Sequence, residues 1–179
     1  MKKLSLVLML MILAITAFAG STPSTSEVMA KASATAKSQG KNVLVIFHAS
    51  WCGWCKKLDA FLEDDDMKAL MNKNFVIVHL DVLEQPDKAS LENPGGEELM
   101  AKLNGAEAGL PFTAVVKPNG TMVINSNAEK KGAAGNVGYP AAPQEIAHFM
   151  EMLKQGAPKM SAADRERIGK WLKDNAPKQ

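Results

Sequence analysis

The chain has 179 residues, with 21 Lys and Arg against 19 Asp and Glu. Two of the basic residues, Lys2 and Lys3, lie at the amino terminus, so residues 20–179 carry 19 charges of each sign and are formally neutral. This charge balance gives no argument for nucleic acid or an anionic membrane as a partner, and we expect neither. The remaining length, about 160 residues, is enough for one domain with its own hydrophobic core.

The first 19 residues are typical of a secretory signal peptide. Lys2 and Lys3 precede an uncharged apolar run at residues 4–18, and the small residues Ala17 and Ala19 stand where a signal peptidase cleaves. The alternative is a membrane anchor, but the run is short for a span, which needs ~20 apolar residues. We therefore expect an exported protein, periplasmic or secreted if the source is bacterial, with no stable membrane insertion after cleavage.

The only two cysteines, Cys52 and Cys55, are separated by two residues. In an oxidising compartment, one structural disulfide is the simplest interpretation. However, a bridge across two intervening residues closes a very small loop and restrains the unfolded chain little. An apolar run at residues 42–47 precedes the pair and a helical pattern follows it, and a C-x-x-C pair between a buried strand and a helix is typical of a redox centre.

Helices and strands alternate along the rest of the chain. Periodic apolar residues and capping signals predict helices at residues 25–38, 54–63, 67–71, 97–103, 143–153 and 161–172. Apolar runs rich in β-branched residues predict strands at 43–47, 75–82, 109–116 and 121–124, the last two joined by a hairpin turn at 117–120. This order indicates an α/β sandwich with a mixed sheet.

Three features resemble the thioredoxin family. Residues 51–56 read W-C-G-W-C-K, similar to the family motif W-C-G-x-C-K; Gly109, Leu110 and Pro111 stand before a strand, like its cis-proline segment; and a hairpin follows that strand. The resemblance covers about residues 41–153. It implies a three-layer sandwich with a central mixed sheet flanked by helices. We expect one domain at 20–179, with its core at about 41–155, an insert at 84–108 that contains the helix at 97–103, and a C-terminal helical extension at 160–175.

The resemblance also implies roles at the motif. A cysteine at a helix start faces unpaired N–H groups, which lower a thiol pKa from about 8.5 to roughly 3.5–7.5. Cys52 is therefore the expected nucleophile and Cys55 the resolving cysteine, leaving a redox-active Cys52–Cys55 disulfide. Pro111 is expected in cis, opposite the dithiol; the alternative is an ordinary trans proline at an edge strand. The substrate groove is expected to comprise Trp51, Gly53, Trp54, Leu110 and Pro111.

Two positions depart from thioredoxin. Its buried aspartate, which handles a proton for the second cysteine, is replaced by Ile46, and the lysine near that aspartate is replaced by His79. Histidine titrates near neutral pH, so His79 or His48 is a candidate for proton handling. The alternative is that both are structural, hydrogen-bonded residues. Trp54 stands where thioredoxin has a proline between the cysteines. The sequence does not determine whether this replacement raises or lowers the reduction potential.

The leading hypothesis is an exported thiol–disulfide oxidoreductase that acts on protein disulfides as a reductant. An oxidase or isomerase of the same fold is the alternative within that class. Two alternatives belong to other functional classes. One is a metal carrier, although two thiolates are too few for a closed zinc site. The other is a non-catalytic peptide-binding module. We expect no cofactor and no bound metal. The expected partners are protein thiols and disulfides and an upstream redox partner, and the expected state is a monomer.

Overall fold

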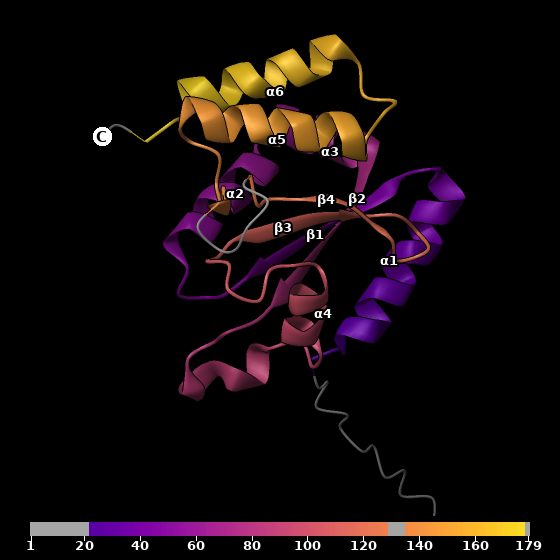
Figure 1. Ribbon diagram of the computed structural model, residues 1–179, viewed down its shortest axis with the longest axis vertical. Coiled ribbons are helices and arrows are strands. Elements are labelled where there is room, and N and C mark those ends of the chain that lie inside the picture. Colours follow the sequence, from indigo (N-terminus) through magenta and orange to yellow (C-terminus); the bar gives the residue numbers. More distant parts are fainter. Residues whose placement is uncertain (1–21, 129–134, 178–179) are drawn as a thin grey trace, which may run out of the picture.

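The computed structural model describes residues 22–128 and 135–177. The signal peptide predicted for residues 1–19 therefore lies outside the described residues. Figure 1 shows a central sheet with helices on both of its faces. Among the helices of the described ranges, none has the length and apolar character needed to span a membrane.

The sheet has four strands in the order β2-β1-β3-β4. Their bounds are β1 Asn42–His48, β2 Phe75–Asp81, β3 Phe112–Val116 and β4 Met122–Asn125. The central strand β1 runs parallel to β2 and antiparallel to β3, which pairs antiparallel with β4. The predicted mixed sheet is confirmed. The five interior residues of β1 are all buried, as expected for a strand covered on both faces.

One predicted strand is shorter than expected. Residues 109–111 do not join β3, whose pairing with β1 begins at Phe112. The reason is that the backbone carbonyls of Gly109 and Pro111 both accept hydrogen bonds from the side chain of Asn136 instead of from a neighbouring strand. This segment is therefore free to form part of a site at the edge of the sheet.

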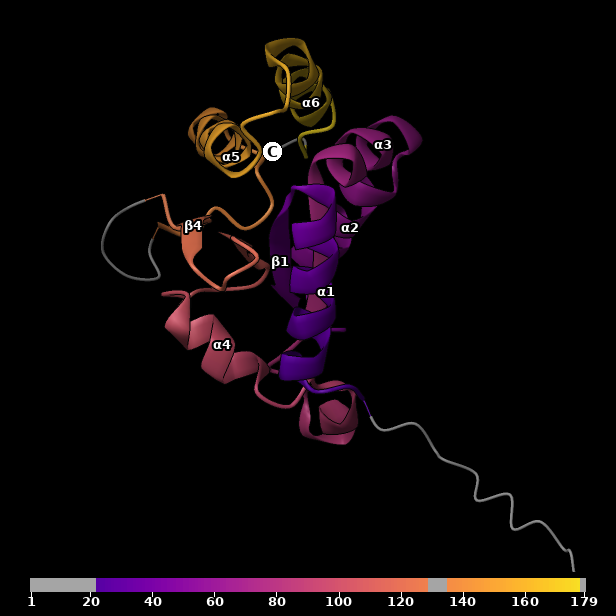
Figure 2. The same ribbon diagram turned by 90° about the vertical axis from the view of Figure 1, so that its right-hand side faces the viewer.

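The helices form two layers. On one face lie α1 (Thr25–Gln39) and α4 (Gly96–Lys102), and on the other lie α2 (Gly53–Glu63), α3 (Asp65–Asn74), α5 (Pro143–Gly156) and α6 (Ala162–Asp174). Figure 2 shows α5 and α6 side by side, on the same side of the sheet as α3. A short 3₁₀ helix, η1 (Pro86–Leu91), was not predicted, because it contributes no buried residue and so leaves no apolar pattern.

Side chains of β1 point alternately into two hydrophobic cores, one on each face of the sheet. Val43, Val45 and Phe47 face the α1 and α4 layer, whereas Leu44 and Ile46 face the layer of α2, α3, α5 and α6. Successive side chains of a strand point to opposite faces, so β1 is sealed on both. The strand is thereby packed on both faces. The turn that leads to the cysteines follows directly after its carboxyl end.

The C-terminal helix is part of this core and not a loose appendage. Ile168 and Leu172 of α6 are fully buried. One carboxylate oxygen of Asp64 caps α3 by accepting the N–H of Met67, and the other accepts the indole N–H of Trp171 at 3.0 Å. Asp64 thus caps a helix, and it also ties α6 to the junction of α2 and α3.

Candidate functional site

The cysteine pair lies where β1 ends and α2 begins. Cys52 is the N-cap residue of α2, and its Sγ accepts a hydrogen bond from the backbone N–H of Cys55 at 3.1 Å. The two cysteines form a disulfide with an S–S distance of 2.05 Å. They are almost equally buried, at 3% and 2% exposed. Their roles are therefore distinguished by position on the helix, not by burial.

The start of α2 favours a negative charge at Cys52. The first turn of a helix has backbone N–H groups without intrahelical partners and carries the positive end of the helix dipole. No acidic residue stands in the first turn of α2 to compete for this position. When the disulfide is reduced, this arrangement stabilises a thiolate on the sulfur that caps the helix.

One wall of the site, here called the proline side, comprises Leu110, Pro111, Asn136 and Tyr139. The peptide bond between Leu110 and Pro111 is cis, which confirms the prediction and makes the trans alternative wrong. Leu110 packs against the cluster formed by Ala49 and the two cysteines. The Nδ2 atom of Asn136 donates to the carbonyl oxygens on both sides of this segment, Gly109 at 2.6 Å and Pro111 at 3.2 Å.

The same wall supports Trp54. The ring of Tyr139 stacks against the indole of Trp54, with centroids 6.3 Å apart and planes inclined by 18°. Tyr139 is 5% exposed, and burial raises the pKa of its hydroxyl, whereas Trp54 is half exposed. Gly138, between Asn136 and Tyr139, has φ +59°, a conformation that favours glycine. The sequence predicted Leu110 and Pro111 as groove residues, but it gave no site role to Asn136 or Tyr139.

The opposite wall, here called the insert side, comprises Ser50, Trp51, Leu83 and Glu84. The indole N–H of Trp51 donates to the carbonyl oxygen of Leu83 at 2.8 Å. The backbone N–H and the hydroxyl of Ser50 both donate to the carboxylate of Glu84, the hydroxyl at 2.8 Å. Neither Leu83 nor Glu84 was predicted as a site residue. The only sequence signal was the position of both at the start of the insert.

An apolar rim surrounds the buried disulfide. In the described part of the chain, the exposed large apolar side chains are Trp51, Trp54, Leu83 and Leu91. Two of them, Trp51 and Leu83, belong to the insert side, and a third, Trp54, stacks on Tyr139 of the proline side. Gly53, between the cysteines, faces open space, because an added Cβ would meet no atom within 4 Å. Exposed apolar surface of this kind is typical of a site for another polypeptide.

Two histidine–carboxylate pairs lie at the carboxyl ends of β1 and β2. His48 Nε2 lies 3.3 Å from Asp81 Oδ1, and His79 Nε2 lies 3.3 Å from Asp59 Oδ1. The two imidazole rings are 5.0 Å apart. Sheet register places His79 opposite Ile46 and Asp81 opposite His48. The structure thus brings the two predicted histidines together, and it adds two carboxylates that the sequence did not indicate.

Partial burial shifts two pKa values in this cluster. Burial and the neighbouring His48 lower the pKa of His79, and the opposing effect of Asp59 is smaller. Burial raises the pKa of Asp81, although His48 acts in the other direction. Both shifts favour the neutral form of the group, so the unprotonated imidazole of His79 is favoured.

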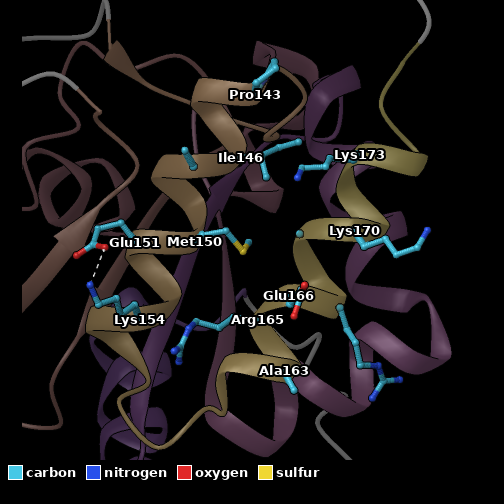
Figure 3. Close-up of a pocket in the computed structure, with 13 residues that line it drawn as sticks. Pro143, Ile146, Met150, Glu151, Lys154, Ala163, Arg165, Glu166, Lys170 and Lys173 are labelled. Carbon is cyan, nitrogen blue, oxygen red and sulfur yellow. Dashed lines mark ion pairs between the residues drawn. The ribbon is translucent and has the colours of Figure 1, made fainter.

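A separate groove lies between α5 and α6 (Figure 3). Its cavity volume is about 840 Å³, and Met150 packs against Gly169 within it. Charged side chains surround it, and Figure 3 marks the pair formed by Glu151 and Lys154. None of its lining residues belongs to either wall of the cysteine site, so it is not the candidate site.

Comparison with known proteins assigns the family. Residues 25–118 match a family model described as thioredoxin-like, which is 94 of the 179 residues. The chain therefore belongs to the thioredoxin-like family, and it carries a C-x-x-C pair, Cys52 and Cys55, flanked by Trp51 and Trp54.

The chain is also similar to several solved structures. A disulphide isomerase from Xylella fastidiosa Temecula1 is 23% identical, covers 80% of this chain and 85% of its own, and has a TM-score of 0.46. A DsbH oxidoreductase is 20% identical, covers 73% and 82%, and has a TM-score of 0.45. The C-terminal domain of Neisseria meningitidis DsbD in the oxidised form is 21% identical, covers 59% and 84%, and has a TM-score of 0.44.

Proposed function

We propose that this chain is an exported thiol–disulfide oxidoreductase that acts on protein disulfides, with the reduced dithiol as the working form. The observation that carries the proposal is the position of Cys52, which caps α2 and is bonded to Cys55 beside the cis Leu110–Pro111 segment. A thiolate at this position is stabilised by the helix start, and the cis-proline segment gives an extended substrate backbone an edge to pair with.

The reaction is a two-electron exchange. The Cys52 thiolate attacks one sulfur of a substrate disulfide, the substrate S–S bond breaks, and the leaving sulfur departs as a thiolate that takes a proton. The Cys55 thiol then loses its proton and attacks Cys52 Sγ. The second substrate thiol is released, and the Cys52–Cys55 disulfide remains. The substrate gains two electrons, which an upstream dithiol partner must restore to the chain.

His79 and His48 are the proposed proton-handling groups. Ile46 cannot serve as a base, and His79 stands opposite it in the sheet register. The lowered pKa of His79 favours its unprotonated form, and in this proposal it accepts the proton that Cys55 loses. The paired carboxylates Asp59 and Asp81 orient the two imidazoles and stabilise the imidazolium that forms.

The first experiment is an insulin-reduction assay with dithiothreitol on residues 20–179. The native protein should accelerate insulin precipitation, whereas Cys52→Ala should be inactive and Cys55→Ala should accumulate mixed disulfides. Glu107→Ala, which removes an exposed carboxylate, serves as a control for handling and folding. Equal rates for native protein and Cys52→Ala would exclude catalysis by this dithiol.

The direction of exchange is tested by equilibration with glutathione. A potential near or below about −270 mV, as in thioredoxin, supports the reductant, and one near about −120 mV supports an oxidase. An isomerase is separated from both by its ability to restore activity to a scrambled multi-disulfide protein without net reduction.

Export is tested by the mass of the mature chain in the source cells. We expect the protein in the envelope or secreted fraction, beginning at Gly20. A chain that retains residues 1–19 in the cytosolic fraction would contradict the export part of the proposal and leave the chemistry untouched.

A further inference from the structure

The insert between β2 and α4 holds the turn that presents Cys52. Consecutive insert residues bind consecutive turn residues: Leu83 accepts the indole N–H of Trp51, and Glu84 accepts both hydrogen bonds from Ser50. The N–H of Cys52 itself closes the turn by donating to Ala49 at 3.0 Å. The two residues that precede the proposed nucleophile are thus attached to a segment more than 30 residues away.

The insert is itself anchored. The backbone N–H of Glu84 donates to the carboxylate of Glu92 at 2.8 Å. Asn93 exchanges two hydrogen bonds with the backbone of Asp81, at 2.7 and 2.9 Å. Leu83 has φ 55°, which a non-glycine residue adopts only when its surroundings determine it. Glu84 therefore lies on a segment that hydrogen bonds fix to the end of β2.

The Glu84 carboxylate is ionised at neutral pH. Burial alone would raise its pKa, but the amide and hydroxyl of Ser50, followed by Lys88 and His48, outweigh burial and lower it. Lys88 Nζ also reaches Ser50 Oγ at 3.3 Å. Hydrogen bonds to an ionised acceptor are stronger than neutral ones, so this carboxylate restrains Ser50 effectively.

We infer that Glu84 is a positioning residue, which holds the 49–51 turn so that Cys52 Sγ stays at the N-cap of α2 in the reduced protein. This inference rests on the proposed function for its use in catalysis. In the oxidised protein the disulfide already holds Cys52 beside Cys55. In the reduced protein that restraint is absent, so the turn depends on its remaining hydrogen bonds. Loss of Glu84 should therefore destabilise the reduced form more than the oxidised form.

The test is the glutathione equilibrium of native protein, Glu84→Ala and Glu84→Gln. Glutamine keeps an acceptor for the Ser50 amide but removes the charge. Positioning predicts that Glu84→Ala shifts the equilibrium about fivefold toward the disulfide form, since one or two net hydrogen bonds are lost, and that Glu84→Gln stays within about twofold of native. Ser50→Ala should shift it in the same direction by less. Glu107→Ala, an exposed carboxylate away from this turn, is the matched control.

Three outcomes would overturn the inference. A purely electrostatic role would shift Glu84→Ala and Glu84→Gln together toward the dithiol form, because removal of a negative charge favours the thiolate. A merely structural role would lower the stability of reduced and oxidised protein equally, and the glutathione equilibrium would not move. The third is a Glu84→Ala equilibrium equal to that of Glu107→Ala. The glutathione equilibrium does not depend on insulin reduction, so the expected shift in Glu84→Ala could be observed even if the native protein failed to reduce insulin. Conversely, if the native protein reduced insulin but the equilibrium of Glu84→Ala did not shift, only this inference would be wrong.

Discussion

The two walls of the disulfide are built differently. The proline side rests on the core: Tyr139 and Pro111 are buried, and Leu110 packs against the cysteines. The insert side rests on hydrogen bonds: Trp51 and Leu83 are exposed, and their connection is polar. The disulfide thus lies between an apolar wall that the whole fold stabilises and a polar wall that is attached locally.

Because of this difference, mutations in the two walls should affect different properties of the protein. A change on the proline side removes core contacts and should lower the free energy of unfolding. A change on the insert side removes hydrogen bonds near the surface, so it should alter the geometry of Cys52 while global stability changes little. The predictions below test whether the two walls can be distinguished in this way.

The largest expected effect comes from Tyr139→Ala. Truncation of this buried ring should cost about 3 kcal/mol of unfolding free energy, as for other buried aromatic residues. Trp51→Ala on the insert side should cost under about 1 kcal/mol, since Trp51 is 50% exposed. Urea unfolding of the oxidised protein measures both. Equal losses would mean that the walls do not differ in their connection to the core.

Asn136→Ala comes next. It leaves the carbonyls of Gly109 and Pro111 without their side-chain donor, and we expect a loss of about 2 kcal/mol. The matched control is Asn175→Ala, whose amide donates to the carbonyl of Trp171 at 2.9 Å on the exposed surface. The control should lose no more than about 0.5 kcal/mol. A loss as small as the control's would show that Asn136 does not hold the proline segment.

The stack of Trp54 on Tyr139 should contribute about 1 kcal/mol. A double-mutant cycle of Trp54→Ala with Tyr139→Leu isolates this coupling. The same cycle with Trp51→Ala should give no coupling energy, because Trp51 belongs to the other wall. A coupling of Trp51 with Tyr139 would break the separation of the two walls.

The smallest effect concerns pH and the histidine pairs behind the site. The pKa of His79 is lowered by burial and by His48, so the folded state binds this proton less readily than the unfolded state. Its contribution to stability is therefore present above about pH 6.5 and lost as the pH falls through the folded pKa. Between pH 7.5 and 5.5, native protein should lose more unfolding free energy than His79→Gln. His148→Gln is the control, and a native-like slope in His79→Gln would contradict the prediction.

Much of the fold was predictable because its signals are local. The apolar run of β1, the capping residues of α1 and the spacing of Cys52 and Cys55 are each contained within a few residues. Local patterns report burial and backbone preference, and they predicted all four strands and the cis bond at Pro111 through resemblance. Where they failed, as at the start of β3, a distant side chain had replaced a strand partner.

The site residues that were missed share a different property. Glu84 meets Ser50 across 34 residues, and Asn136 meets Gly109 across 27. Each looks like an ordinary polar residue of a loop, because its role comes from its partner and not from its neighbours in sequence. Asp59 and Asp81 were missed for the same reason, since only the packing of α2 on the sheet and the strand register bring them to the histidines.

The amino-acid sequence alone determined the chemistry that the chain carries: a close cysteine pair at the start of a helix, after a strand with no polar residue in its interior. Secondary structure and thiol spacing are short-range properties, so they follow from neighbouring residues. Tertiary structure decided how that pair is held, with one wall from Leu110, Pro111, Asn136 and Tyr139 and a polar wall from the insert. Such walls depend on contacts between distant segments, and those contacts exist only once the hydrophobic cores have closed around β1.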